Sequence, residues 1–166
     1  MKNEGKTNEH KPHTGEPVAV GNHTIYVGGV EGFGFGFDPE TGFDVVIPLL
    51  LEWRPAEKRN YVLLDEFRMP DRSGLPANWH ELLKDTLIPR LKNGEKVVTF
   101  CFASHGRTGA LIASLIAILE PEVEDPIAEA RKRHCHEAVE SKAQAEGVFA
   151  LKGKSLPRAY AKSFKF

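Results

Sequence analysis

The sequence predicts an α/β domain, a three-layer α-β-α sandwich around a central and mostly parallel sheet. Apolar runs at 43–51 and 61–64 are continuous rather than alternating, as in strands that are covered on both faces, and a further β-rich run occurs at 96–100. Segments with apolar residues near helical spacing occur at 77–92, from about 107 to 120, and at about 125–139 and 141–151. Helices that separate and follow buried strands in this way favour a parallel sheet with helices on both faces.

Local signals place the individual elements. A short strand, Thr24 to Val27, ends at two glycines, and the strand at 96–100 is expected to be central. Asn93-Gly94 stops the helix at 77–92, and Pro89 predicts a kink or break inside it. The helix that begins near Arg107 ends at Glu120-Pro121.

The 166 residues fit one domain. Residues 1–16 lack apolar periodicity and are expected to form a disordered tail, followed by the domain at 17–151. Residues 152–166 carry five basic side chains and no acidic one, and we interpret them as a solvated basic tail rather than a docking element for an anionic partner.

Composition excludes several classes of protein. Lys plus Arg (22) nearly balances Asp plus Glu (23), so no nucleic-acid partner is expected. The longest apolar stretch, Ala110 to Leu119, is far short of the roughly 20 residues that span a bilayer. The polar start of the chain predicts no signal peptide, and two cysteines suit a reducing cytoplasm. We expect a cytoplasmic monomer; a Cys101–Cys135 disulfide remains open but has no supporting feature.

The stretch from Cys101 to Arg107 joins the central strand to the following helix. A loop at a helix N-terminus directs backbone N–H groups at one point, which suits an oxyanion such as phosphate. The same positive end would favour a reactive thiolate at Cys101. The guanidinium of Arg107 adds a planar fork that matches two phosphate oxygens. The sequence therefore predicts a site that attacks, or at least holds, a phosphate.

Cys-x5-Arg-Thr between a strand and a helix resembles the signature loop of the cysteine-dependent protein tyrosine phosphatases, most of all the small dual-specificity branch. The resemblance extends over roughly 24–150 and implies a phosphomonoester hydrolase without cofactor. It implies that Cys101 is the nucleophile and that Arg107 holds phosphate together with the loop amides. The loop residues in question are Phe102, Ala103, Ser104, His105, Gly106 and Arg107.

The resemblance also implies roles for other residues. Thr108 would donate its hydroxyl to the sulfur, although a plain first-turn position is an equal alternative. Asp71, in a Met-Pro-Asp segment followed by Gly74 and Pro76, is similar to the mobile acid loop and would be the general acid. Asp65, directly after a strand, is its rival. Gln144 would position the hydrolytic water, with an ordinary solvated glutamine as the alternative.

No metal site is expected. His134, Cys135 and His136 are adjacent, but neighbours at i and i+2 do not share a helix face and no second ligand cluster is evident. His105 is expected at the rim of the pocket.

Two departures from the family pattern bear on activity. Phe100 stands where a histidine usually precedes the nucleophile, and Ser104 stands where a glycine is usual. Alternative functions are therefore a phosphate-binding module with little or no turnover, and thiol redox chemistry with Cys135 as the resolving cysteine. The expected substrate is a phosphorylated protein, with phosphotyrosine as the first choice; RNA ends and small phosphomonoesters remain open.

Overall fold

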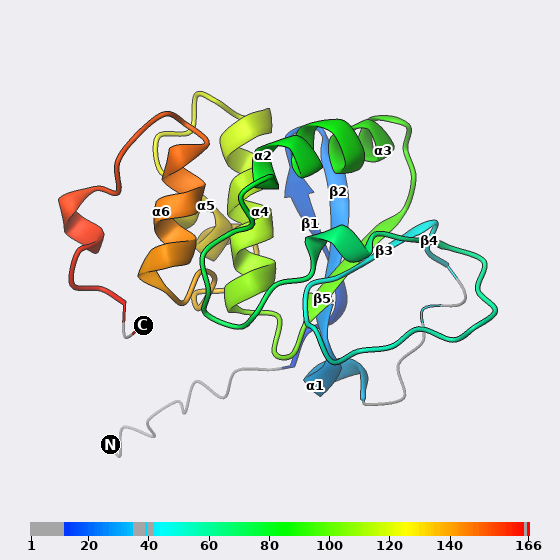
Figure 1. Cartoon of the computed structure of the whole chain (residues 1–166). Coiled ribbons are helices and arrows are strands. Elements are labelled where there is room, and N and C mark those ends of the chain that lie inside the picture. Colours follow the sequence, from blue (N-terminus) through cyan, green and yellow to red (C-terminus); the bar gives the residue numbers. More distant parts are fainter. Residues whose placement is uncertain (1–11, 35–38, 40–41, 165) are drawn as a thin grey trace, which may run out of the picture.

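The computed structural model describes residues 12–34, 39, 42–164 and 166. Its centre is a five-stranded sheet in the order β1-β2-β5-β3-β4 (Figure 1). The strands are β1 (Thr14–Val20), β2 (His23–Gly29), β3 (Val45–Pro48), β4 (Val62–Leu63) and β5 (Val97–Cys101). β1 is antiparallel to β2, whereas β2, β5, β3 and β4 are parallel to one another. The expected mostly parallel sheet is confirmed.

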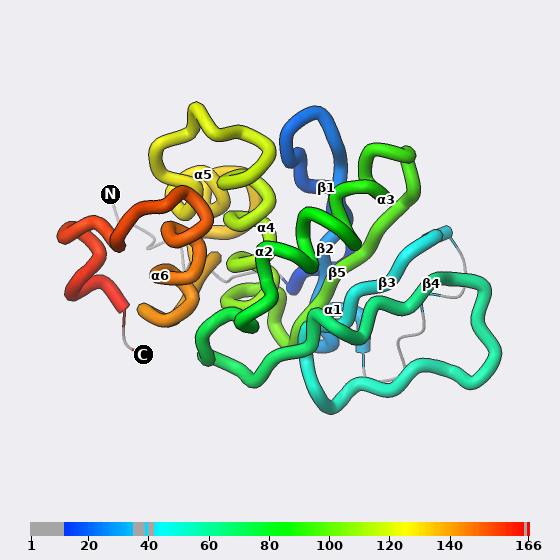
Figure 2. The backbone as a smooth tube through the Cα atoms, turned by 45° about the horizontal axis from the view of Figure 1, so that its top comes forward, coloured from blue at the N-terminus to red at the C-terminus, as the bar shows by residue number. Residues whose placement is uncertain are grey.

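Helices lie on both sides of this sheet, unequally. The segment of α2 (Trp79–Glu81), η2 (Leu82–Leu87) and α3 (Ile88–Lys92) packs on one face together with α4 (Gly106–Leu119). On the far side of α4 lie α5 (Pro126–Arg133) and α6 (Lys142–Ala150), so that α4 is enclosed (Figure 2). The opposite face is covered by the single-turn α1 (Val30–Phe33) and the chain that follows β3. Two short 3₁₀ helices, η1 (Asp65–Phe67) and η3 (Arg158–Tyr160), complete the elements.

The position of the central strand β5 explains why four of its five residues are apolar. Val97 and Cys101 belong to the larger hydrophobic core under α4, while Val98 and Phe100 belong to a smaller core on the other face. Because successive side chains of a strand point to opposite faces, a strand between two cores is largely apolar. The exception is the buried Thr99, whose hydroxyl donates to the Ile47 carbonyl oxygen at 3.1 Å. Phe100 therefore points away from the face that carries Cys101.

Pro89 changes the winding of the helical segment at 79–92 instead of breaking it. Leu82–Leu87 is π-helical, and the N–H of Ile88 donates to the carbonyl of Leu83, five residues earlier. Proline has no N–H for the ordinary helical bond, and a wider turn accommodates its ring. The helix ends at Asn93-Gly94 as predicted, with Gly94 at φ +74°.

Parts of both segments that we interpreted as tails belong to the folded domain. Residues 14–16, which we assigned to the disordered tail, belong to β1, while residues 1–11 lie outside the described part. In the segment after 151, Tyr160 and Phe164 pack against the core, and the Tyr160 hydroxyl donates to Asp125 at 2.6 Å. Among the described residues, no helix combines the length and apolar character that crossing a membrane requires.

Candidate functional site

Cys101 is the last residue of β5, at the edge where the parallel strands end. Gly29 of β2 lies beside it in the register, and Pro48 of β3 lies beside the preceding residue. Ligands of open α/β sheets bind outside the carboxyl ends of the strands. The Cys101 side chain is only 4% exposed, and α4 begins five residues later, at Gly106.

The loop between β5 and α4 is tightly enclosed. A Cβ atom on Gly29 would lie 2.5 Å from the Phe102 carbonyl oxygen, so only glycine fits beside this loop. Ser104 is fully buried and adopts φ +66°, a left-handed conformation that glycine adopts without strain. Such a residue within a turn makes successive N–H groups point to one side, as in anion-binding nests.

His134 forms a hydrogen bond to the backbone of the loop. Its Nε2 donates to the Ser104 carbonyl oxygen at 2.6 Å. Burial, with smaller contributions from neighbouring groups, lowers the pKa of His134 to about 4, so the ring is neutral near pH 7. Because C=O and N–H point in opposite directions across a trans peptide, this bond turns the His105 N–H away from His134.

Thr108 contacts the candidate nucleophile directly. Its hydroxyl donates to Cys101 Sγ at 3.2 Å, and both side chains are buried. The first N–H groups of α4, at Gly106, Arg107 and Thr108, have no acceptor within the helix. Thiol, hydroxyl and helix N-terminus thus lie together.

Arg107 connects this loop to the segment that carries Asp71. Arg107 is 5% exposed, and its Nη1 donates to the Met69 carbonyl oxygen at 3.2 Å. Its Nε lies 3.7 Å from Asp71 Oδ1 and has no hydrogen-bond partner among the described residues. A buried arginine that has an N–H group without a hydrogen-bond acceptor is suited to bind an anionic ligand.

The two candidate acids occupy different environments. Asp71 lies beside Arg107 and its side chain is 54% exposed. Asp65 instead accepts a 2.7 Å hydrogen bond from Arg68, whose Nη1 also donates to the carbonyls of Leu50 and Trp53. The structure brings Asp71 to the loop and engages Asp65 in a local ion pair.

Gln144 is fully buried at the start of α6, which rules out a solvated helix position. It forms a capping box with Ser141, and its Oε1 accepts from the N–H groups of Glu140 and Ser141. Its Nε2 is buried and has no hydrogen-bond partner among the described residues. The oxygen thus fixes the side chain and leaves the amide nitrogen as a donor.

Sequence reasoning missed several polar side chains around the loop. Glu140 lies against Gly106, where an added Cβ would meet the Glu140 carboxyl at 3.1 Å. Burial, followed by the nearby charge of Asp71, raises the pKa of Glu140. His105 Nδ1 lies 3.0 Å from Glu137 Oε2 and 3.7 Å from Glu140 Oε1. No local motif marks these acids; only the fold brings them to the loop.

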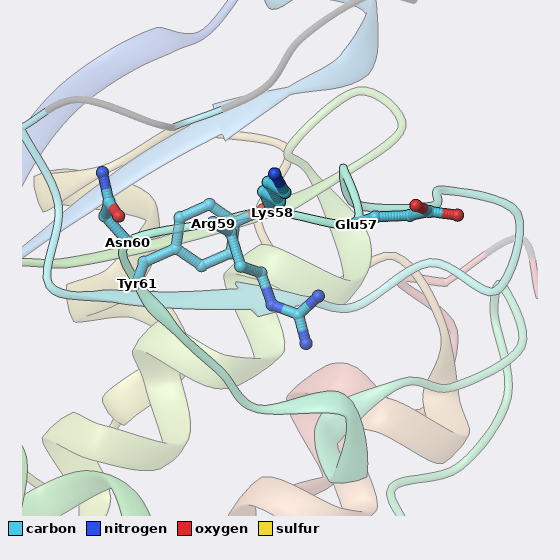
Figure 3. A pocket seen from close by; sticks show the side chains of 5 residues that line it. All are labelled: Glu57, Lys58, Arg59, Asn60 and Tyr61. Atoms are coloured by element: carbon cyan, nitrogen blue, oxygen red, sulfur yellow. The ribbon is translucent and has the colours of Figure 1, made fainter.

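Among the described residues, two hollows bear on the position of a binding site. One, of about 600 Å³, is lined by Glu57, Lys58, Arg59, Asn60 and Tyr61 (Figure 3). These side chains come from one stretch of chain and do not converge on a point, and Tyr61 is buried in the smaller core, so we do not assign the chemistry of Cys101 to this hollow. The other, of about 460 Å³, includes Arg72, Arg131, Glu137 and Glu140 and lies beside the loop.

Solved structures with the same architecture decide the fold family. The chain superposes on Tk-PTP in its active form with a TM-score of 0.63 over 83% of this chain and 97% of the other, at 20% identity. For kinase associated phosphatase with its catalytic cysteine replaced by serine, the TM-score is 0.66 over 86% and 94%, at 12% identity. This is the protein tyrosine phosphatase fold. A mouse putative dual specificity phosphatase complexed with zinc tungstate also shares this phosphatase fold, with a TM-score of 0.56 over 90% of this chain and 92% of that one, at 12% identity.

Comparison at the level of sequence adds one relative. No protein-family model matches the chain. An uncharacterized protein of Methanocaldococcus jannaschii is 31% identical over 96 residues, which is 58% of this chain. The match spans 60% of that protein's length.

Proposed function

We propose that this chain is a phosphomonoester hydrolase of the dual-specificity or tyrosine protein phosphatase type. It would act through a cysteinyl-phosphate intermediate. The observation that carries the proposal is the 3.2 Å contact between Thr108 Oγ1 and Cys101 Sγ at the start of α4, beside the buried Arg107. A thiol at a helix N-terminus with a hydroxyl donor is suited to act both as nucleophile and as leaving group.

In the first step the Cys101 thiolate attacks phosphorus and the bond to the leaving oxygen breaks. The amides of 102–107 and the Arg107 fork stabilise the charge on the three other oxygens. Asp71 gives its proton to the leaving oxygen. Arg107 lies close enough to Asp71 to couple phosphate binding to the position of the acid segment.

In the second step water attacks phosphorus and the phosphorus–sulfur bond breaks. Asp71 takes the proton from water, while Thr108 stabilises the departing thiolate. The Gln144 amide nitrogen, held by the capping box, is the donor we assign to the water. We propose a phosphorylated protein as substrate, with phosphotyrosine preferred.

Hydrolysis of p-nitrophenyl phosphate by matched variants tests these roles. Cys101→Ser should abolish turnover, and Asp71→Asn should lower kcat by about a hundredfold or more. Asp65→Asn is the matched control and should change kcat little, because Asp65 is engaged with Arg68. The acid assignment is wrong if Asp65→Asn loses activity while Asp71→Asn retains it.

A second candidate, a phosphate-binding module with little turnover, is favoured by Phe100. This side chain is fully buried against Trp53, with ring centroids 4.9 Å apart, so no polar group supports the nucleophile from that position. Undetectable turnover with retained phosphopeptide affinity would favour this candidate over the hydrolase.

A further inference from the structure

A cluster of imidazoles and a thiol lies behind the phosphate-binding loop. His13 precedes β1, His105 belongs to the loop, and His134 and Cys135 follow α5. The His13 ring centroid is 5.5 Å from that of His105 and 4.6 Å from that of His134. His13 and Cys135 are 7% and 5% exposed, so the centre of the cluster is screened from water.

The potential ligand atoms are already close together. Those of His13, His105 and Cys135 all lie within 4.8 Å of one another, and so do those of His13, Glu16 and His134. Ligand atoms around a tetrahedral zinc ion are about 3.5 Å apart, given bond lengths of roughly 2.0–2.3 Å. Small side-chain movements would therefore bring the ligand atoms of His13, His105 and Cys135 to the distances that a zinc ion requires.

The histidines also have the outer partners that orient metal ligands. His134 donates through Nε2 to the Ser104 carbonyl, and His105 Nδ1 faces the Glu137 carboxylate at 3.0 Å. In a neutral imidazole, donation from one nitrogen leaves a lone pair on the other. Carbonyl and carboxylate partners of this kind fix the ring and the tautomer of metal-binding histidines. The remaining nitrogen of His134, Nδ1, is buried and has no hydrogen-bond partner among the described residues.

The expectation of no metal here assumed that 134–136 continue a helix. α5 ends at Arg133, so His134 and Cys135 lie in the following turn and the helical argument against a shared ligand set does not apply. The second group of ligands that the sequence did not reveal comes from His13 and His105, which are distant in the chain.

We propose that His13, His105 and Cys135 bind one Zn²⁺ ion, with the fourth position of the tetrahedron taken by water. Imidazole and thiolate ligands select zinc over magnesium or calcium, which prefer oxygen. Binding releases the Cys135 thiol proton to solvent and forms a zinc–thiolate bond. The ion joins the start of β1, the phosphate-binding loop and the turn after α5. Zinc would therefore hold the loop in its phosphate-binding conformation.

The test uses the full chain carrying Cys101→Ser, so that the candidate nucleophile cannot ligate the ion. Protein stripped with a chelator is loaded with Zn²⁺ or Co²⁺. Metal content and the cobalt absorption spectrum are then measured. We expect one ion per chain and a thiolate-to-cobalt charge-transfer band. Neither readout requires turnover, so failure here would leave the proposed hydrolase untouched.

Single variants in this background assign the ligands. Cys135→Ser should remove the charge-transfer band. His13→Ala should weaken zinc binding by more than about a hundredfold, which is a larger loss than expected for a residue that only hydrogen-bonds to a metal ligand. The exposed His80 of α2 provides the control, and His80→Ala should bind like the parent. Absence of stoichiometric metal in the parent, or parent-like binding by both Cys135→Ser and His13→Ala, overturns the proposal.

Discussion

The Nε2 atom of His134 lies 2.6 Å from the carbonyl oxygen of Ser104, so a residue after α5 sets the orientation of a peptide in the loop between β5 and α4. The bond joins positions 30 residues apart in sequence. Its consequence is that the His105 N–H points away from His134. The conformation of the loop thus depends on a contact outside the signature motif.

Replacing His134 should weaken phosphate binding. His134→Phe keeps a buried ring but removes the donor, and we expect the dissociation constant of inorganic phosphate to rise about three- to tenfold, the effect of one hydrogen bond near 1 kcal/mol. Calorimetric titration measures it. His134→Gln retains a donor at a similar distance and should bind more tightly than His134→Phe; equal binding by the two variants would argue against this role.

Thr108 should act mainly in the second chemical step. Thr108→Val preserves shape but removes the donor to the sulfur, so departure of the thiolate should slow by about ten- to a hundredfold, the range for a hydrogen bond to a charged group. Rapid-quench kinetics should then show a burst of product followed by slow turnover. Thr108→Ser keeps the hydroxyl and is the control. A Thr108→Val enzyme with unchanged turnover would assign Thr108 a purely helical role.

Ser104 should be a source of strain. It combines φ +66° with a buried hydroxyl that has no hydrogen-bond partner among the described residues. Ser104→Gly should therefore raise the free energy of unfolding by about 1 kcal/mol, net of the added freedom of glycine in the unfolded chain. Urea unfolding provides the measurement. Ser104→Ala removes only the hydroxyl and separates its cost from that of the backbone; a less stable Ser104→Gly would contradict the strain.

Glu140 should make stability depend on pH. Burial raises its pKa above the ordinary 4.5, so the folded state binds more protons than the unfolded state in this range. Stability contributed by the protonated carboxyl is full below the unfolded pKa and is lost as pH rises through the folded one. Glu140→Gln should thus be more stable than the parent at pH 7 and equal to it near about pH 4. Urea midpoints at the two pH values test this, with the exposed Glu124→Gln as a control that should change neither. A Glu140→Gln protein that is less stable at pH 7 would contradict the sign.

The sequence was sufficient for the parts of the fold that local patterns encode. Continuous apolar strands and the Cys101–Arg107 loop predicted β3, β5 and α4, because burial on two faces leaves a direct mark on composition. β1 was missed because Gly15 and Pro17 interrupt its pattern, although it pairs with β2 along most of its length.

The surroundings of the loop could not be predicted in the same way. His13, His134 and Glu140 reach the loop from three separate segments, and no spacing in the sequence links them. We interpreted the C-terminal segment from its basic charge, but its aromatic residues determine its position. The rings of Tyr160 and Phe164 stack with centroids 5.8 Å apart, and the Arg131 guanidinium lies over both.

The most direct test of the account is the chemical identity of the phosphorylated intermediate. Protein carrying Thr108→Val is mixed with p-nitrophenyl phosphate, quenched in acid and analysed by peptide mass spectrometry. The account predicts one phosphoryl group per chain, on the peptide that contains Cys101, and none when Cys101→Ser is added. Turnover by wild-type protein with no phosphate on Cys101, or with phosphate on another side chain, would contradict it.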